Sequence, residues 1–395
     1  MTISFPLAMD NWDDRETQAI ARTIKSNRLT MGQNVKTFER EVAAKFGSRF
    51  AVMVNSGSSA NLLMLTALKI SRVLGSGPRK NIIVPALSWS TTFTPAYFLD
   101  FELRFVDIDE GHFGISDELI SSAIDENTIA ILAVNILGSA CNLNKLSELA
   151  DKNRIWLLED NCESLGASIS GRHTGSVGKM ATHSSFYSHH LNTMEGGWIT
   201  TDDEDLYDIL RSLRAHGWTR ELPATSKLRT SNQVDDFEAL FEFVLPGLNF
   251  RPLEIEASIG LVQLEKFDDM LSIRRSNATH FIDLFKSLEG VRIQTPIGES
   301  SWFAFALVFE NRDLRNRVAT LLQRNGVECR PIITGNFTRQ EALNHLHYKI
   351  YSTLPVADRL HDCGLYIGNH PVELKHELTF TYNLISNFLS QESDV

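Results

Sequence analysis

The sequence predicts an α/β protein: a large, mainly parallel β-sheet with helices on both faces, followed by a smaller C-terminal α+β domain. Its 395 residues are enough for two such domains. Short β-branched apolar runs alternate with helical stretches over roughly the first half of the chain, and this alternation is typical of a parallel sheet. We place the boundary after residue 285, which gives a large domain over 1–285 and a small domain over 286–395.

Two helices should open the chain, at Trp12–Ser26 and Asn34–Phe46, and Gly47 is a plausible stop for the second. The predicted strands that follow are Phe50–Val54, Ile82–Ala86, Arg104–Ile108, Ile129–Asn135, Ile155–Glu159, Thr182–Tyr187 and Trp198–Thr201. The helices between and after them are Ser59–Val73, Ser116–Ile124, Leu143–Lys152 and Glu204–His216. In such a sheet ligands bind at the carboxyl ends of the strands, so the residues that follow those ends are the candidates for chemistry.

The last third of the chain changes its pattern. A long helical stretch, Leu253–Ser287, leads out of the large domain. The elements predicted after it are a strand at Trp302–Phe309, a helix at Leu314–Asn325, a strand at Val327–Pro331 and helices at Gln340–Tyr348 and Glu373–Phe388. This mixture predicts the α+β composition of the small domain.

Composition narrows the class of function. Apolar residues make up 43% of the chain and charged residues 22%, as in ordinary globular proteins, and the net charge is −11. That charge disfavours non-specific binding to nucleic acid or anionic membranes. No apolar run approaches the roughly 18 residues of a membrane span, and the four cysteines lack metal-site spacing. We therefore expect a cytoplasmic protein with reduced thiols and without a metal ion.

Polar and aromatic residues follow three of the predicted strands. Asn55–Ser59 links the first strand to a helix, and the exposed N–H groups of Gly57 and Ser58 there would suit a phosphate. Trp89 follows the second strand, and Asp160 ends the strand Ile155–Glu159, where a buried carboxylate needs a cation. On these residues alone, helix caps and a core aromatic side chain remain open interpretations.

The segment Ser184–Gly197 reads Ser-Ser-Phe-Tyr-Ser-His-His-Leu-Asn-Thr-Met-Glu-Gly-Gly. It closely resembles the active-site segment of the DegT-type sugar aminotransferases, which have the fold type I (aspartate aminotransferase-like) architecture of enzymes that use pyridoxal phosphate (PLP). Those enzymes hold PLP through a lysine six residues before Glu-Gly-Gly, and His189 stands at that position. Imidazole cannot form a Schiff base with an aldehyde. The resemblance therefore implies PLP or pyridoxamine phosphate held non-covalently, with His189 as a proton shuttle and His190 as the alternative.

The resemblance also implies roles for other residues. The cofactor contacts it implies are Gly57, Ser58 and Ser184 at the phosphate, Trp89 on the pyridine ring, Asp160 at the ring nitrogen, Glu163 near the ring hydroxyl and Asn249 at the phosphate of the other subunit. Glu163 departs from the usual Gln or His and matches a dehydratase branch of the family. Asn249 implies a homodimer with shared active sites. Three arginines, Arg251, Arg220 and Arg330, are candidate clamps for a carboxylate or a nucleotide phosphate.

The dehydratase branch implies an activity. It removes the C3 hydroxyl from GDP-4-keto-6-deoxy-D-mannose, with L-glutamate as amino donor, in dideoxysugar biosynthesis (colitose, O-antigen). Two alternatives stay open: a 4-keto-sugar aminotransferase that uses His189 or a distant lysine such as Lys179 or Lys227, and a non-catalytic sugar-nucleotide-binding relative. Loss of catalysis by decay should also have eroded Asp160, Ser184 and Trp89, and all three are present. The guanine base rests on the resemblance alone, because the chain shows no base-reading motif.

Overall fold

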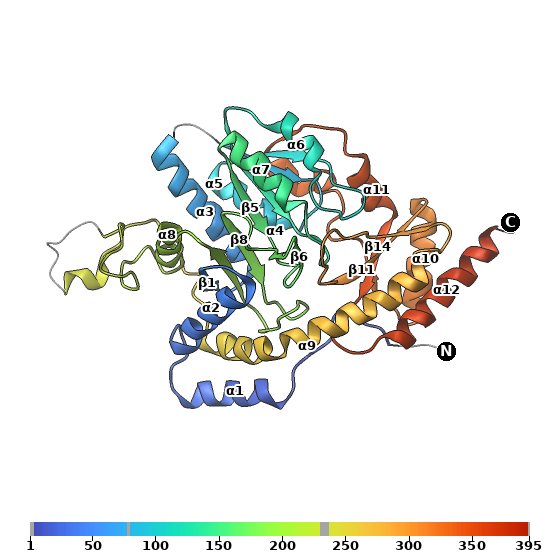
Figure 1. The fold of residues 1–395 in the computed structure, drawn as a ribbon, viewed down its shortest axis with the longest axis horizontal. Coiled ribbons are helices and arrows are strands. Elements are labelled where there is room, and N and C mark those ends of the chain that lie inside the picture. Colours follow the sequence, from blue (N-terminus) through green and yellow to red (C-terminus); the bar gives the residue numbers. More distant parts are fainter. Residues whose placement is uncertain (1–3, 77–79, 230–236, 394–395) are drawn as a thin grey trace.

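A computed structural model describes residues 4–76, 80–229 and 237–393. In this part of the chain an eight-stranded sheet has the order β1-β9-β8-β5-β4-β2-β3-β13, and only the two pairs that involve β9 are antiparallel (Figure 1). Its strands are β1 (Phe50–Val54), β2 (Asn81–Pro85), β3 (Glu102–Val106), β4 (Thr128–Val134), β5 (Trp156–Asp160), β8 (Met180–Ser184), β9 (Gly197–Thr201) and β13 (His347–Ile350). The predicted mainly parallel α/β fold is confirmed.

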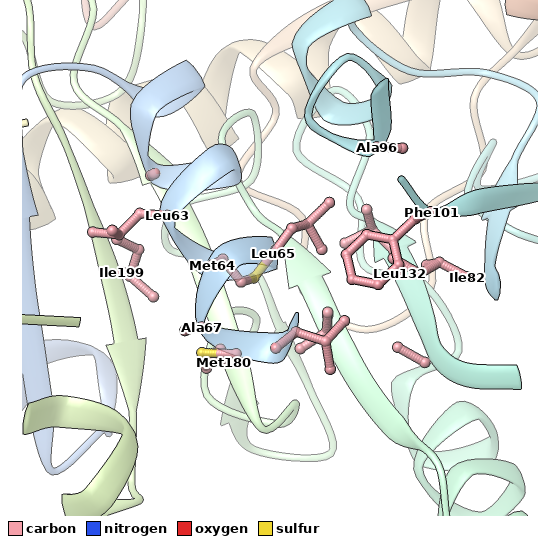
Figure 2. Packing of buried hydrophobic residues seen from close by; sticks show 14 of the residues in the cluster. Leu63, Met64, Leu65, Ala67, Ile82, Ala96, Phe101, Leu132, Met180 and Ile199 are labelled. Carbon is pink, nitrogen blue, oxygen red and sulfur yellow. The ribbon is translucent and has the colours of Figure 1, made fainter. Parts of the chain in front are cut away.

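Helices cover both faces of the sheet because the strand side chains alternate between them. On β1, Val52 and Val54 belong to a core cluster with α3, whereas Ala51 and Met53 belong to a cluster with α2 and α9. Figure 2 shows leucine and methionine side chains of α3 lying over strands of the sheet. The helices of this domain are α1 (Asp14–Lys25), α2 (Gln33–Phe46), α3 (Gly57–Ser76), α4 (Ser90–Phe93), α5 (Pro95–Leu99), α6 (Asp117–Ala123), α7 (Leu143–Asn153) and α8 (Glu204–Arg214).

The helix boundaries follow from capping residues. Asp13 and Glu16 form a capping box at the start of α1, which satisfies backbone N–H groups that have no partner within the helix. Helix α2 ends at Gly47, whose φ of 78° is left-handed, so the predicted stop is confirmed. The strand predicted at Thr182–Tyr187 ends earlier, at Ser184, so the following residues form a loop. Two short strands, β6 (Ser168–Ile169) and β7 (Arg172–His173), make a small hairpin.

Helix α9 (Glu254–Phe285) connects the large sheet to the small one. The part of α9 up to Leu271 packs in the large domain, for example through Phe267, and its last turns pack against the small sheet through Phe281 and Phe285. The small sheet is antiparallel, and its strands in spatial order are β10 (Val291–Ile293), β11 (Ala304–Phe309), β14 (Gly364–Gly368) and β12 (Cys329–Arg330). Helices α10 (Arg312–Arg324), α11 (Pro355–Cys363) and α12 (Lys375–Ser393) complete this region. The division at 285/286 stays a prediction.

The helix predicted at Gln340–Tyr348 is wrong. A short 3₁₀ turn, η3 (Glu341–His345), is followed by β13, which pairs in parallel with β3 at the edge of the large sheet. Leu343 and Leu346 have helical spacing, but Leu343 anchors a single turn and each residue of β13 is exposed. Two other 3₁₀ turns are η1 (Glu238–Phe241) and η2 (Phe337–Arg339). Among the described helices none is long and apolar enough to cross a membrane.

Candidate active site

The first turn of α3 and the end of β8 meet at the carboxyl edge of the sheet. A Cβ atom on Gly57 would lie 2.8 Å from Cβ of Ser184 and 3.2 Å from Sγ of Cys162, so only glycine allows this approach. Ser58 is exposed, and its Oγ lies 2.8 Å from Oγ1 of Thr91. The N-terminus of a 20-residue helix beside two hydroxyl groups is suited to an anion such as a phosphate.

Asp160 is a buried carboxylate at the end of β5. Its Oδ2 accepts hydrogen bonds from Nδ2 of Asn61 (3.0 Å) and Oγ1 of Thr92 (2.7 Å), and its Oδ1 accepts one from the backbone N–H of Cys162 (3.2 Å). The side chain of Asn61 is fixed in turn by Thr182, which donates to its Oδ1 at 2.7 Å. Within the described ranges no lysine or arginine forms an ion pair with Asp160. Its carboxylate therefore lacks the cation that a buried carboxylate usually has.

Trp89 and Glu163 occupy the same edge of the sheet. Trp89 is 58% exposed, so it is not the core aromatic that its position after a buried strand allowed. Glu163 is partly buried, and its Oε2 accepts a hydrogen bond from the backbone N–H of Leu137 (3.1 Å). Burial, with a smaller contribution from the negative charge of Asp160, raises the pKa of Glu163 to about 7. This carboxyl group can therefore carry a proton near neutral pH.

His189 lies in the loop between β8 and β9, which is closed by hydrogen bonds such as Thr193 N–H to the Ser185 carbonyl (2.9 Å). Its Nδ1 lies 2.7 Å from the carbonyl oxygen of Cys162, which can only accept, so Nδ1 carries the proton and Nε2 is left as the base. The ring also packs on Phe303, with centroids 5.2 Å apart. Burial lowers the pKa of His189 to about 4, so the imidazole is neutral at pH 7.

His190 differs from its neighbour in surroundings. Only 3% of it is exposed, and its Nε2 lies 3.1 Å from the carbonyl oxygen of Ser301, which makes Nε2 the protonated nitrogen. Burial and the nearby Arg274 lower the pKa of His190 well below its usual value. Its ring packs on Phe303 from the buried side, with centroids 5.6 Å apart. His190 therefore ties the loop to the segment before β11, whereas His189 remains partly exposed beside Cys162.

The three predicted arginines lie in two different parts of the structure. Arg330 lies on β12, opposite Tyr366 on β14. Burial raises the pKa of Tyr366 to about 12; the negative charge of Glu163 adds to this shift and the positive charge of Arg330 opposes it. Arg330 therefore belongs to the surroundings of Glu163. Arg220 and Arg251 instead line a cavity beside α1 and the end of α8. Asn249 is exposed, and its Oδ1 accepts a hydrogen bond from Nε of Arg251 (3.0 Å).

The family model of the DegT/DnrJ/EryC1/StrS aminotransferases matches residues 10–378. The chain belongs to this family. It is 45% identical to GDP-4-keto-6-deoxy-D-mannose 3-dehydratase of Yersinia pseudotuberculosis, over 97% of this chain and 98% of that protein. Two crystal structures of such a dehydratase, each 43% identical and with a TM-score of 0.93, cover 97% of this chain and 100% of theirs; one contains GDP-perosamine and the other a trapped PLP-glutamate geminal diamine.

In this member of the DegT/DnrJ/EryC1/StrS family, neither lysine considered as an alternative nucleophile is near His189. The Nζ atom of Lys179 lies 2.7 Å from Asp203 near the start of α8, and that of Lys227 lies 2.7 Å from Asp205 on the surface. Both amines are therefore engaged in ion pairs outside the site. In the described part of the chain no group of three His, Cys, Asp or Glu side chains could hold a metal ion.

Several residues of the site were not found from the sequence. Asn61 and Thr92 hold Asp160, and Phe303 supports both histidines from the small domain. Asn61 lies one turn after Gly57 on α3, so the helical spacing could have placed it on the inner face. Thr92 and Phe303 reach the site from elements whose packing the sequence did not specify.

Proposed function

We propose that this chain removes the C3 hydroxyl of GDP-4-keto-6-deoxy-D-mannose to give GDP-4-keto-3,6-dideoxy-D-mannose, using PLP/pyridoxamine phosphate and L-glutamate. The observation that carries this proposal is His189, a neutral imidazole at the family's lysine position, in a site that otherwise has the groups the cofactor needs. The GDP-perosamine and PLP-glutamate complexes of the related dehydratases support the substrate and the amino donor. Dideoxysugar (colitose, O-antigen) biosynthesis is the route this product would serve.

The residues present fit the cofactor. Asp160 is a buried carboxylate with which no lysine or arginine of the described residues forms an ion pair, and this suits the protonated nitrogen of a pyridine ring. Trp89 offers an exposed ring face. Gly57 and Ser58 form the N-terminus of α3, which lies beside Ser184 and suits the phosphate. When bound, pyridoxamine phosphate supplies the amine that joins the sugar ketone and a ring that withdraws electrons.

We assign proton transfer during the removal of the C3 hydroxyl to His189. Because Nδ1 is held as donor by the Cys162 carbonyl, Nε2 is the atom that accepts a proton at neutral pH. The lowered pKa of His189 means that the imidazolium, once formed, gives its proton up readily. The departing C3 hydroxyl needs a proton, and the imidazolium of His189 would supply it. A lysine here would instead bind the cofactor covalently and return a proton to the sugar, which favours amino transfer.

Glu163 can hold a proton beside the same site. Its raised pKa, about 7, keeps much of the carboxyl protonated at neutral pH, so it can donate a hydrogen bond to an anionic oxygen such as that of the ring hydroxyl. Arg330 and Tyr366 stand on the small-domain side of this carboxyl group. We assign the three residues to the binding of the cofactor and the substrate.

A homodimer with shared active sites is part of this proposal. The segments 215–219 and 242–249 lie antiparallel after the end of α8, joined by the isolated bridges Ala215–Asn249 and Trp218–Phe243 and by bonds such as Val244 N–H to the Gly217 carbonyl (2.9 Å). We call this pair of segments the ribbon. The ribbon and the adjoining turn expose Phe241 (66%), Phe243 (54%) and Leu248 (51%), and apolar exposure of this kind marks an interface. Asn249 on the ribbon would reach the phosphate in the partner. Cytoplasmic localisation remains a prediction from composition.

The experiment is mass spectrometry of the sugar nucleotide after incubation of the purified protein with PLP, L-glutamate and GDP-4-keto-6-deoxy-D-mannose. We expect a product lighter by one oxygen atom, with release of ammonia and 2-oxoglutarate. An amino sugar would instead make the protein an aminotransferase. Recovery of unchanged substrate while PLP and glutamate are consumed would also refute the proposed activity. His189→Asn is the matched variant for this assay.

A further inference from the structure

One buried arginine in the described part of the chain has no carboxylate partner. Three arginines are buried among the described residues, and two of them, Arg104 and Arg214, each form ion pairs with two carboxylates. The third, Arg274 on α9, is only 4% exposed, and within the described ranges no carboxylate oxygen lies within 4.0 Å of its guanidinium nitrogens. Burial lowers the pKa of Arg274 to about 10, so the group is still a cation at neutral pH. A buried charge without a counter-ion is costly, which indicates that the charge itself has a use.

Arg274 joins α9 to the small sheet. Its Nη1 donates hydrogen bonds to the carbonyl oxygens of Phe303 (3.3 Å), just before β11, and of Asn369, just after β14. The Nδ2 of Asn369 donates in return to the Arg274 carbonyl (3.2 Å) and also to the Trp302 carbonyl (2.7 Å). Its Oδ1 accepts a hydrogen bond from Nδ2 of Asn277 on α9 (3.2 Å). This buried network fixes the guanidinium group and the Phe303 backbone relative to each other.

Phe303 connects this network to the two histidines. Its ring packs on His189 and on His190, with centroids 5.2 Å and 5.6 Å apart. The Ser301 carbonyl, two residues before Phe303, also lies 3.1 Å from Nε2 of His190. Arg274 therefore bonds to the backbone of the residue whose side chain supports both imidazole rings. Its charge acts on them strongly, because buried surroundings screen charge poorly.

Few charged groups face His189. Asp160, at the end of β5, is the negative one, and the thiol of Cys162 stays neutral because burial raises its pKa well above the usual value. His190 stays neutral because burial, together with the charge of Arg274, lowers its pKa. Burial lowers the pKa of His189 to about 4; the Cys162 carbonyl and Asp160 oppose this shift, and Arg274 adds to it. Among the described residues, Arg274 is therefore the cation that acts on His189.

We propose that Arg274 is a positioning residue for the proposed reaction: its guanidinium group holds the Phe303 backbone against α9 and places an unneutralised positive charge near the imidazole of His189. A carboxylate partner would cancel this charge, which accounts for the lack of one among the described residues. A second cation near Arg274 is disfavoured, so His189 stays neutral as a base, and its imidazolium gives up the proton readily. The inference rests on the proposed function for the role of His189 as the proton carrier.

The test is a histidine-selective NMR titration of the PLP-loaded wild type, Arg274→Gln and Arg274→Lys, with the His189 signal assigned from His189→Asn. Glutamine can still donate to the Phe303 carbonyl but has no charge, whereas lysine keeps the charge. We expect the protonated fraction of His189 at about pH 5 to rise roughly threefold to fivefold in Arg274→Gln, and to stay at the wild-type value in Arg274→Lys. The acidic limb of the pH–rate profile for deoxygenation should move to higher pH in Arg274→Gln alone.

Arg275→Gln is the matched control. This residue is next in sequence on α9, but its charge is paired with Glu299 (3.6 Å), so its loss should leave the titration of His189 unchanged. If Arg274→Gln does not fold, Arg274→Met carries the same test, because it removes a buried charge without leaving a carboxylate unpaired.

Two results would overturn the assignment of Arg274. One is an equal protonated fraction of His189 in wild type and Arg274→Gln, and the other is an equal rise in the glutamine and lysine variants. The titration needs no sugar nucleotide, so it is independent of the proposed reaction. Absence of a deoxygenated product together with the expected NMR change would refute the reaction and retain Arg274 as the residue that keeps His189 neutral.

Discussion

The cofactor cradle around Asp160 and the basic cavity beside α1 and the end of α8 are built on opposite physical plans. In the cradle, Asp160 is buried and held by Asn61, Thr92 and the Cys162 amide, so its position is fixed before any ligand arrives. In the cavity, Arg28 and Arg220 are exposed and bonded only to neutral groups. The first region supplies fixed geometry, and the second supplies two guanidinium groups, Arg28 and Arg220, that form no ion pair with the described residues.

The difference teaches where each kind of interaction is useful. A reaction that moves a proton needs donors and acceptors fixed in position, which a hydrogen-bonded buried network provides. Capture of an anionic ligand needs charge, which exposed arginines supply and which also speeds association. Changes in the cradle should therefore act on the rate of reaction, and changes in the cavity on substrate affinity.

Asp160→Asn is the change that should break the cradle most severely. The amide cannot stabilise a protonated ring nitrogen, so we expect the turnover number for deoxygenation to fall roughly a hundredfold to a thousandfold. GDP affinity should stay at the wild-type value. Steady-state kinetics and GDP titration measure the two quantities, with Asp151→Asn on α7 as the control. A loss of GDP affinity of similar size would show that the cradle and the cavity do not act on separate steps.

Glu163→Gln should change how the free energy of unfolding depends on pH, which tests the buried character of the cradle. Burial raises the pKa of Glu163 from the ordinary value of a glutamate to about 7, so the folded state holds a proton that is lost as pH rises, and its contribution to stability is lost with it. Between about pH 5 and about pH 8, cofactor-free wild type should lose about 2 kcal/mol of unfolding free energy relative to the variant, after allowance for partial exposure. Urea unfolding at both pH values measures this, and parallel pH profiles would contradict it.

Salt should produce the smallest effect and should act on the cavity alone. Raising ionic strength screens exposed charges, so the KM for the GDP-sugar should rise several-fold between about 50 mM and about 300 mM salt. The turnover number should change little, because the cradle is buried and hydrogen-bonded. The measurement is a kinetic series in sodium chloride with PLP in excess. A constant KM would show that the arginines do not contribute unscreened charge to binding.

The large sheet could be predicted from the sequence because its strands are buried, β-branched runs. The boundaries of β1 were predicted to the residue, and those of β2 within one residue at each end. The edge strand β13 was not predicted, since its four residues are all exposed and their polar–apolar alternation, His-Tyr-Lys-Ile, is too short to stand out from the helical spacing before it. Only the pairing of its backbone with β3 defines it, and that pairing depends on the tertiary fold.

The candidate site divides in the same way. Spacing and resemblance led to Asp160, Ser184 and His189, which the structure brings to one edge of the sheet. Neither paired Asn61 and Thr92 with Asp160: helical spacing could place Asn61 on the inner face of α3, but the contacts of α3 and α4 with the end of β5 depend on the tertiary fold. The lining of the cavity could not be predicted from the sequence, because its basic side chains come from segments far apart in the chain. Arg330, a candidate clamp together with Arg220 and Arg251, lies opposite Tyr366 and not in this cavity.

The most direct test of the account is the rate of C3 deoxygenation by His189→Asn loaded with PLP and glutamate. Asparagine retains a hydrogen-bonding side chain but cannot move a proton, so the rate should fall roughly a hundredfold to ten-thousandfold while PLP absorbance and GDP affinity remain. Mass spectrometry of the sugar nucleotide over time gives the rate. Deoxygenation by the variant within about twofold of wild type would show that another group moves the proton and would contradict the assignment of His189.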